Sequence, residues 1–224
     1  MDRDLVDQVI DTAAKVAASG AIGGNMHGNV SLRVDGADEM YFTAGTSMRE
    51  HPRELVVRVG LDGTLREGSL PPIQGAVVDM HTDRYKQDPA VTCVVHTHAP
   101  FATAFATARK SLGCWIEALA MFGLADGVPL AGYGPRGSEQ ALNNIRDAVL
   151  PGCPAVLLAN HGVLVFHKSA DLAVLVNGVV EEAAAAGYRA SQLGGAAELS
   201  PDMRTAALQR AMTLDAAGTR VADS

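Results

Sequence analysis

Several features that mark particular classes of protein are scarce in this sequence. Aromatic residues make up only 4% of it, and 18 Lys and Arg face 25 Asp and Glu, which gives a net charge of −7. A negative net charge without a local basic stripe argues against a nucleic-acid partner. No apolar run reaches the roughly 18 residues that a membrane span requires, so we expect no membrane partner either.

Cysteine is also scarce. Cys93, Cys114 and Cys153 are odd in number and widely spaced, which indicates reduced core thiols and not a disulfide framework. The first 16 residues alternate charged and apolar side chains, and they lack the basic start and apolar block of a secretory signal. Together these features predict a cytoplasmic protein.

The sequence does contain enough apolar residues for one sizeable core. Its 224 residues are 48% hydrophobic and show no repeat or linker, so we expect a single domain over residues 1–224, with a C-terminal tail from about residue 198. The periodicities predict an α/β sandwich, a mainly antiparallel sheet covered by helices. Helices are expected at 2–19, 76–87, 99–109, 138–149, 170–193 and 203–214, and strands at 29–33, 40–43, 55–59, 91–95, 155–159 and 163–166.

Three histidines follow two of the expected buried strands. His96 and His98 come directly after the β-branched run 91–95, and His161 follows the apolar run 155–159. Residues two apart on a strand share a face, so two imidazoles can reach one ion and a third can complete the site. Three His ligands with an open fourth position are the pattern of catalytic zinc, although imidazole also suits Mn²⁺, Co²⁺, Ni²⁺ and Fe²⁺. We therefore predict a divalent ion, zinc first, on His96, His98 and His161.

The other histidines are weaker candidates. His51 and His167 lie beside charged residues and are expected to be solvated. His81, on the expected helix 76–87, could be a fourth ligand, but a structural role is favoured. His27, in the Gly-rich stretch before residue 29, could touch substrate or satisfy backbone groups.

Five segments of the chain resemble the class II aldolase and adducin-head family, which includes L-fuculose-phosphate aldolase and L-ribulose-phosphate 4-epimerase. Most specific is Val-Val-His-Thr-His before a helix, followed later by Asn-His-Gly. The segments keep the family's order and spacing over residues 5–195, and they are Gly28-Asn-Val-Ser-Leu-Arg33, Tyr41-Phe-Thr43, His81 to Tyr85, Pro89 to Pro100 and Ala159-Asn-His-Gly-Val163.

The resemblance implies a class II aldolase-like α/β/α sandwich with helices on both faces of the sheet. It also implies a homotetramer with active sites at subunit interfaces, zinc or a similar ion on the three histidines, and a role in carbohydrate metabolism. Family chemistry runs through a metal-stabilised enolate, in which the ion polarises a carbonyl while a C–C or C–H bond breaks. Asn29 would orient the substrate oxygens.

The sequence departs from the family at the usual acid/base. Val77 stands where the aldolases carry a catalytic glutamate and the epimerases an aspartate. Valine can neither ligate metal nor transfer a proton. Asp79 is the nearest carboxylate, but two residues along a helix turn it about 200° round, so we expect it to point away from the site.

A second departure concerns phosphate. Gly75-Ala76 replace a serine pair that binds phosphate in the family aldolases, and Met26 replaces a usual threonine. Since phosphate needs several donors to balance its charge, we expect a non-phosphorylated substrate. Thr46, Ser47 and Arg49 could still form a different anion site. The candidate substrate-binding residues are His27, Gly28, Asn29, Thr46 and Ser47.

Glu117 is the candidate general acid/base. It lies near the position at which the methylthioribulose-phosphate dehydratase branch of the family, which also lacks the usual glutamate, carries its own. Its apolar neighbours, such as Trp115, would desolvate it and raise its pKa, whereas the alternative is an exposed helical glutamate.

Arg136 could hold a substrate carboxylate, although a turn in which Ser138 caps the next helix is the favoured interpretation. Glu181 and Glu182 are expected to be solvated or at an interface.

These observations predict a metal-dependent aldolase-type lyase, an aldehyde-lyase, that acts on a small hydroxy-carbonyl substrate. A dehydratase, an epimerase or a decarboxylase would follow the same metal-enolate logic. An alternative of another class is a non-catalytic, adducin-like assembly module, against which the three intact histidines argue.

Overall fold

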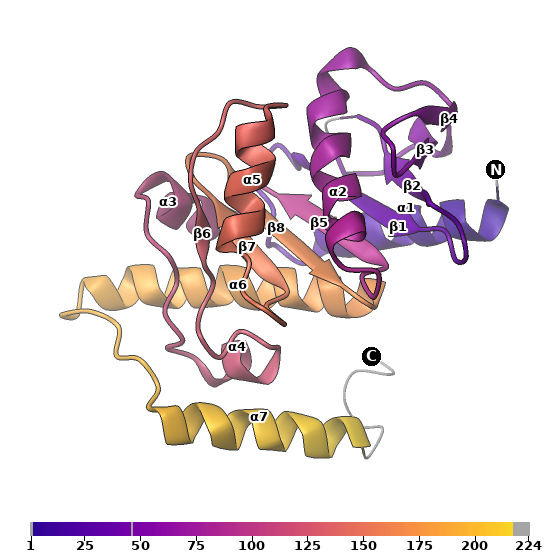
Figure 1. The fold of residues 1–224 in the computed structure, drawn as a ribbon. Helices are drawn as coiled ribbons and strands as arrows, with labels where there is room; N and C mark the ends of the chain where they lie inside the picture. Colours follow the sequence, from indigo (N-terminus) through magenta and orange to yellow (C-terminus); the bar gives the residue numbers. More distant parts are fainter. Residues whose placement is uncertain (1, 46, 217–224) are drawn as a thin grey trace.

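The computed structural model, which describes residues 2–45 and 47–216, is an α/β/α sandwich (Figure 1). Its eight-stranded sheet has the order β4-β3-β2-β1-β5-β8-β7-β6. Neighbouring strands pair antiparallel except β6 and β7, which pair parallel. The strands are β1 (Gly28–Arg33), β2 (Glu39–Thr43), β3 (Val56–Gly60), β4 (Leu65–Glu67), β5 (Cys93–Thr97), β6 (Leu130–Ala131), β7 (Ala155–Leu158) and β8 (Gly162–His167).

Helices cover both faces of the sheet. One face packs against α1 (Arg3–Ala18), α3 (Pro100–Thr107) and α6 (Ala170–Ser191), and the other packs against α2 (Gly75–Gln87) and α5 (Glu139–Ala148). Because strand side chains alternate between the faces, the sheet separates two apolar clusters: Val95 and Val165 belong to the first, and Val94 and Leu164 to the second. The predicted mainly antiparallel sandwich is confirmed.

Most predicted elements lie within a few residues of their expected bounds. The Asp62-Gly63 turn joins β3 to β4 as a hairpin. The segment 155–166 is a second hairpin, in which the chain reverses between β7 and β8, so that His161 lies in the turn. The short helix α4 (Glu117–Met121) and the two-residue strand β6 were not expected.

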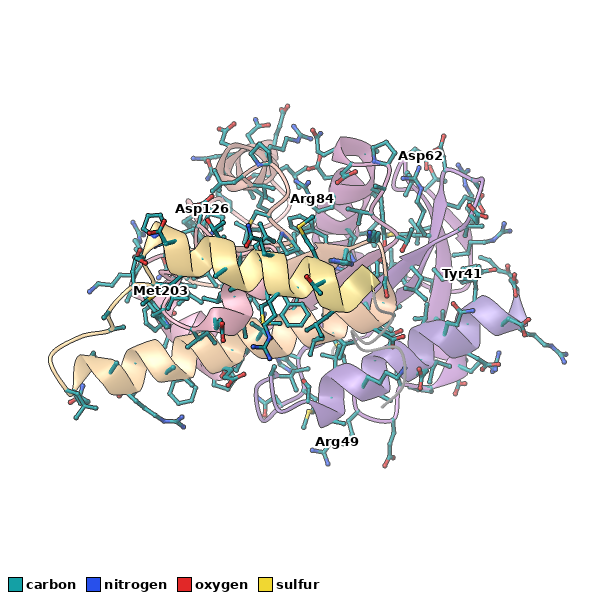
Figure 2. All side chains as sticks on the ribbon, turned by 90° about the horizontal axis from the view of Figure 1, so that it is seen from below. Tyr41, Arg49, Asp62, Arg84, Asp126 and Met203 are labelled. Atoms are coloured by element: carbon teal, nitrogen blue, oxygen red, sulfur yellow. The ribbon has the colours of Figure 1, made fainter. Side chains whose placement is uncertain are left out.

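The C-terminal region contains a packed helix. α7 (Pro201–Ala216) is longer than the predicted 203–214 and packs on α4, outside α6 (Figures 1 and 2). Ala207 and Ala211 are buried there, and the Arg204 guanidinium donates to the carbonyl oxygens of Ala125 and Leu199.

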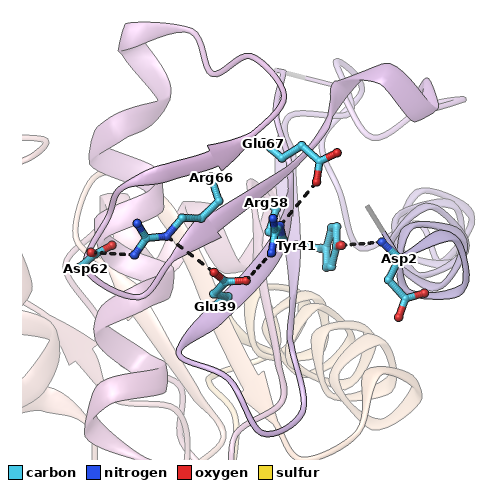
Figure 3. Close-up of polar contacts among 7 residues, drawn as sticks. All are labelled: Asp2, Glu39, Tyr41, Arg58, Asp62, Arg66 and Glu67. Atoms are coloured by element: carbon cyan, nitrogen blue, oxygen red, sulfur yellow. Dashed lines mark hydrogen bonds and ion pairs between the residues drawn. The ribbon is translucent and has the colours of Figure 1, made fainter.

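The outer strands carry charged pairs away from the histidines. Arg58 lies 2.9 Å from Glu39 and 3.5 Å from Glu67, and Arg66 lies 3.0 Å from Asp62 (Figure 3). Charged side chains on a sheet edge discourage pairing with another strand.

The three cysteines are free and buried, as the sequence predicts. Among the residues that the structure describes, no helix is both long enough and apolar enough to cross a membrane.

Candidate metal centre

Three imidazoles meet at one end of the central strands. His96, His98 and His161 each offer a ring nitrogen, and these nitrogens lie within 4.8 Å of one another. A zinc ion held at about 2.1 Å by each nitrogen requires separations of roughly 3.5 Å, so adjustments of about 1 Å would close the site. The three residues therefore fit a divalent ion.

The backbone sets this convergence. His96 lies on β5, pairs with Asn29 of β1 and faces the α2 side of the sheet, while His98 follows the strand and His161 lies in the β7–β8 turn. A Cβ on Gly162 would lie 2.4 Å from the Thr97 carbonyl oxygen, so only glycine lets the turn approach β5 this closely. Asn160 adopts a φ of 59° in the same turn, a conformation that asparagine tolerates.

The electrostatic surroundings hold the imidazoles neutral. Burial lowers the pKa of His161 to about 4, with further contributions from His98 and Arg136. Burial likewise lowers the pKa values of His96 and His98. The His96 Nδ1 atom lies 2.9 Å from the Val163 carbonyl oxygen, which orients the ring and leaves Nε2 for the site. Neutral imidazole is the form that binds metal, so the site is in a binding-competent state near neutral pH.

A buried chain of hydrogen bonds leads to Asn29. The Ser31 hydroxyl lies 2.8 Å from His81 Nδ1, and His81 Nε2 lies 2.9 Å from Asn29 Oδ1. Since Asn29 Oδ1 only accepts, Nε2 carries the ring hydrogen and the serine hydroxyl donates to Nδ1. His81 is therefore a structural histidine, as favoured from the sequence, and it fixes the Asn29 amide.

The other predicted substrate-binding residues lie beside the histidines. His27 pairs with Ser47 across an isolated bridge, and the His27 ring lies 6.1 Å from that of His98. Gly28 permits close packing, since a Cβ there would lie 2.5 Å from the His96 carbonyl oxygen. Thr46 lies outside the described residues.

His51 corrects an expectation of solvation. Its ring is buried and lies between the carbonyl oxygens of Ser47 and Leu55, at 3.1 and 3.4 Å. Its neighbours in sequence include the charged Glu50 and Arg53, but the ring turns inward against the backbone of Ser47 and Leu55. His51 therefore shapes the loop that carries Ser47.

A cavity of about 260 Å³ opens beside His161, between α2 and α5. Val77 lines it together with Met80 and Ile145. The Arg136 Nη2 atom lies 3.3 Å from His161 Nε2. Ser138 also caps α5 as expected, by accepting from the Ala141 amide, so the loop has both a capping role and a place at the site.

The carboxylates lie elsewhere in the single chain. Glu117 is exposed in the first turn of α4, on a helix that packs against α6 and α7, so the desolvation expected from its neighbours is absent within one chain. Asp79 is exposed on α2. Glu181 corrects the expectation of a solvated residue, because it is buried and accepts from the Phe101 and Ala102 amides at the start of α3.

The curated relatives include 5-deoxy-D-ribulose 1-phosphate aldolase of Bacillus thuringiensis serovar kurstaki, 29% identical over 84% of this chain and 86% of that protein. They also include L-fuculose phosphate aldolase of Methanococcus maripaludis, 28% identical over 72% of this chain and 84% of that protein.

Solved structures share the fold. An L-fuculose 1-phosphate aldolase superposes with a TM-score of 0.82 at 23% identity, over 94% of this chain and 97% of that one. YgbL of Escherichia coli, described as a putative aldolase/epimerase/decarboxylase, gives 0.78 at 22% identity, over 92% and 98% of the two chains.

The model of one family matches residues 7–188, a span that contains all three histidines, Asn29 and the cavity-lining residues of α2 and α5. The chain belongs to the class II aldolase and adducin N-terminal domain family.

Proposed function

We propose that this protein is a metal-dependent, aldolase-type lyase that cleaves a C–C bond in a small hydroxy-carbonyl compound. The observation that carries the proposal is the convergence of three neutral imidazoles beside a cavity in a chain of this family. Zinc is the proposed ion, because three His ligands and an open position are its catalytic pattern. When bound, the ion would supply Lewis acidity toward a substrate carbonyl.

Asn29 is proposed to orient the substrate. Its Oδ1 atom accepts from His81, so its amide hydrogens remain to donate toward substrate oxygens. The substrate is proposed to lack phosphate, since Gly75-Ala76 at the start of α2 carry no hydroxyl and Gln74 makes no side-chain cap there. The relatives named above act on sugar phosphates, so this would be a difference in specificity within the family.

Glu117 is the proposed proton carrier, and it would act in the site of a neighbouring subunit of a homotetramer. Its exposure on α4, a helix whose described contacts include α6 and α7, supports delivery across an interface. When the C–C bond of a hydroxy-carbonyl substrate is cleaved, the hydroxyl must lose a proton, and the carbon of the departing carbonyl fragment must gain one. A carboxylate that reaches both atoms can accept the first proton and donate the second.

Metal analysis is the first test. Purified protein should hold close to one equivalent of divalent ion per chain, and His98→Ala should lose it while circular dichroism shows a retained fold. Less than about half an equivalent would sink the enzyme proposal and favour the assembly module. Products from hydroxy-ketones and oxo acids, offered with and without phosphate, would separate a lyase from a dehydratase, an epimerase or a decarboxylase.

Complementation tests the role of Glu117. Glu117→Gln should lower the rate by about 100-fold or more. Hybrids that combine His98→Ala subunits with Glu117→Gln subunits should regain activity, because an intact metal site then meets an intact glutamate from its neighbour. Inactive hybrids would place Glu117 in its own subunit's site or outside the mechanism. Glu182→Gln, which alters an exposed glutamate on α6, is the matched control.

A further inference from the structure

Arg136 places a positive charge directly beside the histidine site. Its Nη2 atom lies 3.3 Å from His161 Nε2, and it lines the same cavity as His161 and Val77. Arg136 is an exposed residue that also lines the cavity, so it lies at the rim.

The loop that carries Arg136 is held in place at both ends. The Asn144 side chain donates to the carbonyl oxygens of Gly132 and Tyr133, and Ser138 caps α5. Arg136 therefore projects from an anchored turn, which is what a residue that recognises a ligand requires.

No carboxylate within the described ranges 2–45 and 47–216 is recorded as an ion-pair partner of Arg136. By contrast, Arg58, Arg66 and Arg146 each pair with an aspartate or a glutamate. An arginine beside a site for a dication is repelled by that dication. An anion that lies between the two would compensate both charges.

We infer that Arg136 and the three-histidine site together bind the carboxylate of a small 2-oxo or 2-hydroxy acid. This inference rests on the proposed function and names its substrate class. A planar carboxylate can accept two hydrogen bonds from one guanidinium, and the adjacent oxygen of the acid would lie on the side of the histidines. Phosphate fits less well, because it needs several donors and the cavity wall includes the apolar side chains of Ala76, Val77 and Met80.

Paired probes that differ only in charge test this assignment. Titration calorimetry on metal-loaded protein would compare pyruvate with pyruvamide, its neutral amide, and with inorganic phosphate. We expect pyruvate to bind more tightly than pyruvamide. Arg136→Met should weaken pyruvate about tenfold or more while leaving pyruvamide and metal content unchanged, since loss of a charge-assisted pair costs at least that much. Arg136→Lys should recover only part of the loss.

Arg210→Met, which removes an exposed cation from α7, is the control and should leave pyruvate affinity unchanged. Equal losses for pyruvate and pyruvamide, or an unchanged affinity in Arg136→Met, would overturn the inference. So would phosphate binding that depends on Arg136 while pyruvate binding does not. A protein that loads metal and prefers pyruvate yet cleaves no substrate would overturn the proposed lyase and leave the carboxylate site standing. A protein that does not load metal would overturn both.

Discussion

At the scale of single residues, the metal centre depends on neighbours that are not ligands. His81 could have been a fourth ligand by sequence, but its two ring nitrogens are engaged by Ser31 and Asn29. Asn29, which is proposed to orient the substrate, is thus itself oriented by the buried imidazole of His81 on α2.

Replacing Ser31 tests this chain of hydrogen bonds. Ser31→Ala leaves His81 Nδ1 without its donor in a fully buried site, so the free energy of unfolding should fall by about 1–3 kcal/mol. Urea denaturation measures it. Ser191→Ala, at an exposed position on α6, should change stability by less than about 0.5 kcal/mol. Equal effects of the two changes would contradict the assigned role.

His81 also makes stability depend on pH. Burial lowers its pKa from 6.5 to about 3, so below pH 6.5 the unfolded chain binds a proton there that the folded chain does not. The contribution of His81 to the free energy of unfolding is therefore fully present above pH 6.5 and is lost as the pH falls toward 3. Between pH 7 and pH 5 this loss should amount to about 2 kcal/mol. Unfolding curves of wild type and His81→Gln across this range should converge as pH falls. Parallel curves would show that His81 does not contribute this dependence.

The roles of single residues could be predicted from the sequence where they depend on the spacing of nearby residues. His96, His98 and His161 were found because each follows an apolar run in the sequence, and the structure brings them together. The burial of Glu181 could not be found in this way, since Phe101 and Ala102, whose amides it accepts from, lie about 80 positions away in the sequence. The partners of His51 lie only four residues away, but its charged neighbours in the sequence gave no sign that the ring turns toward the backbone. Arg136 was a candidate from its motif, but its contact with His161 joins residues 25 positions apart.

At the scale of elements, α3 illustrates how a helix start can be completed from a distance. Ala99 precedes the helix and offers no side-chain cap, while the Glu181 carboxylate on α6 accepts from the Phe101 and Ala102 amides. Negative charge at a helix N-terminus is stabilising. The start of α3, directly after His98, is thereby tied to α6.

Removing that carboxylate should loosen the start of α3. Glu181→Ala leaves two amides without acceptors and should cost about 1–3 kcal/mol of stability, whereas Glu181→Gln keeps one acceptor oxygen and should cost less. Chemical denaturation provides the values, and hydrogen exchange at Phe101 and Ala102 should quicken in the alanine variant. Unchanged exchange there would show that Glu181 is dispensable to α3.

The strands and helices themselves were well predicted, because hydrophobic periodicity is a property of the local sequence. The exceptions have physical reasons. α4 is too short to show a period, and β6 has two residues that pair only because β7 lies beside them. The two strands of the β7–β8 hairpin were predicted at 155–159 and 163–166, but their antiparallel pairing was not predicted, because it depends on the turn at Asn160.

At the scale of the whole molecule, α7 adds a layer that the two-faced sandwich does not require. Arg204 joins it to Ala125 and Leu199, and Figure 2 shows the helix outermost on its side of the molecule. A helix was predicted at 203–214 within the C-terminal tail, and the structure extends it to Pro201–Ala216 and packs it on α4.

Arg204→Ala should weaken the packing of α7 on α4 without unfolding the rest of the domain. Loss of its hydrogen bonds to two carbonyl oxygens should lower the local opening free energy of α7 and α4 by about 1–3 kcal/mol, while metal content stays unchanged. Hydrogen exchange followed by mass spectrometry reports on each helix separately. Arg210→Ala, on an exposed position of the same helix, should leave the exchange unaltered. Faster exchange across the entire sheet would instead assign α7 to the global core.

The partition of the core by the sheet bears on how such a protein can change its chemistry over time. The cavity wall, with Val77, Met80 and Ile145, belongs to the apolar cluster under α2 and α5, while the cluster under α1, α3 and α6 lies behind the sheet and shares none of these side chains. Substitutions that reshape the cavity wall would therefore disturb the packing of only one of the two apolar clusters. The cavity on one face of the sheet can therefore change its substrate in the course of evolution, while the apolar cluster on the other face continues to stabilise the fold.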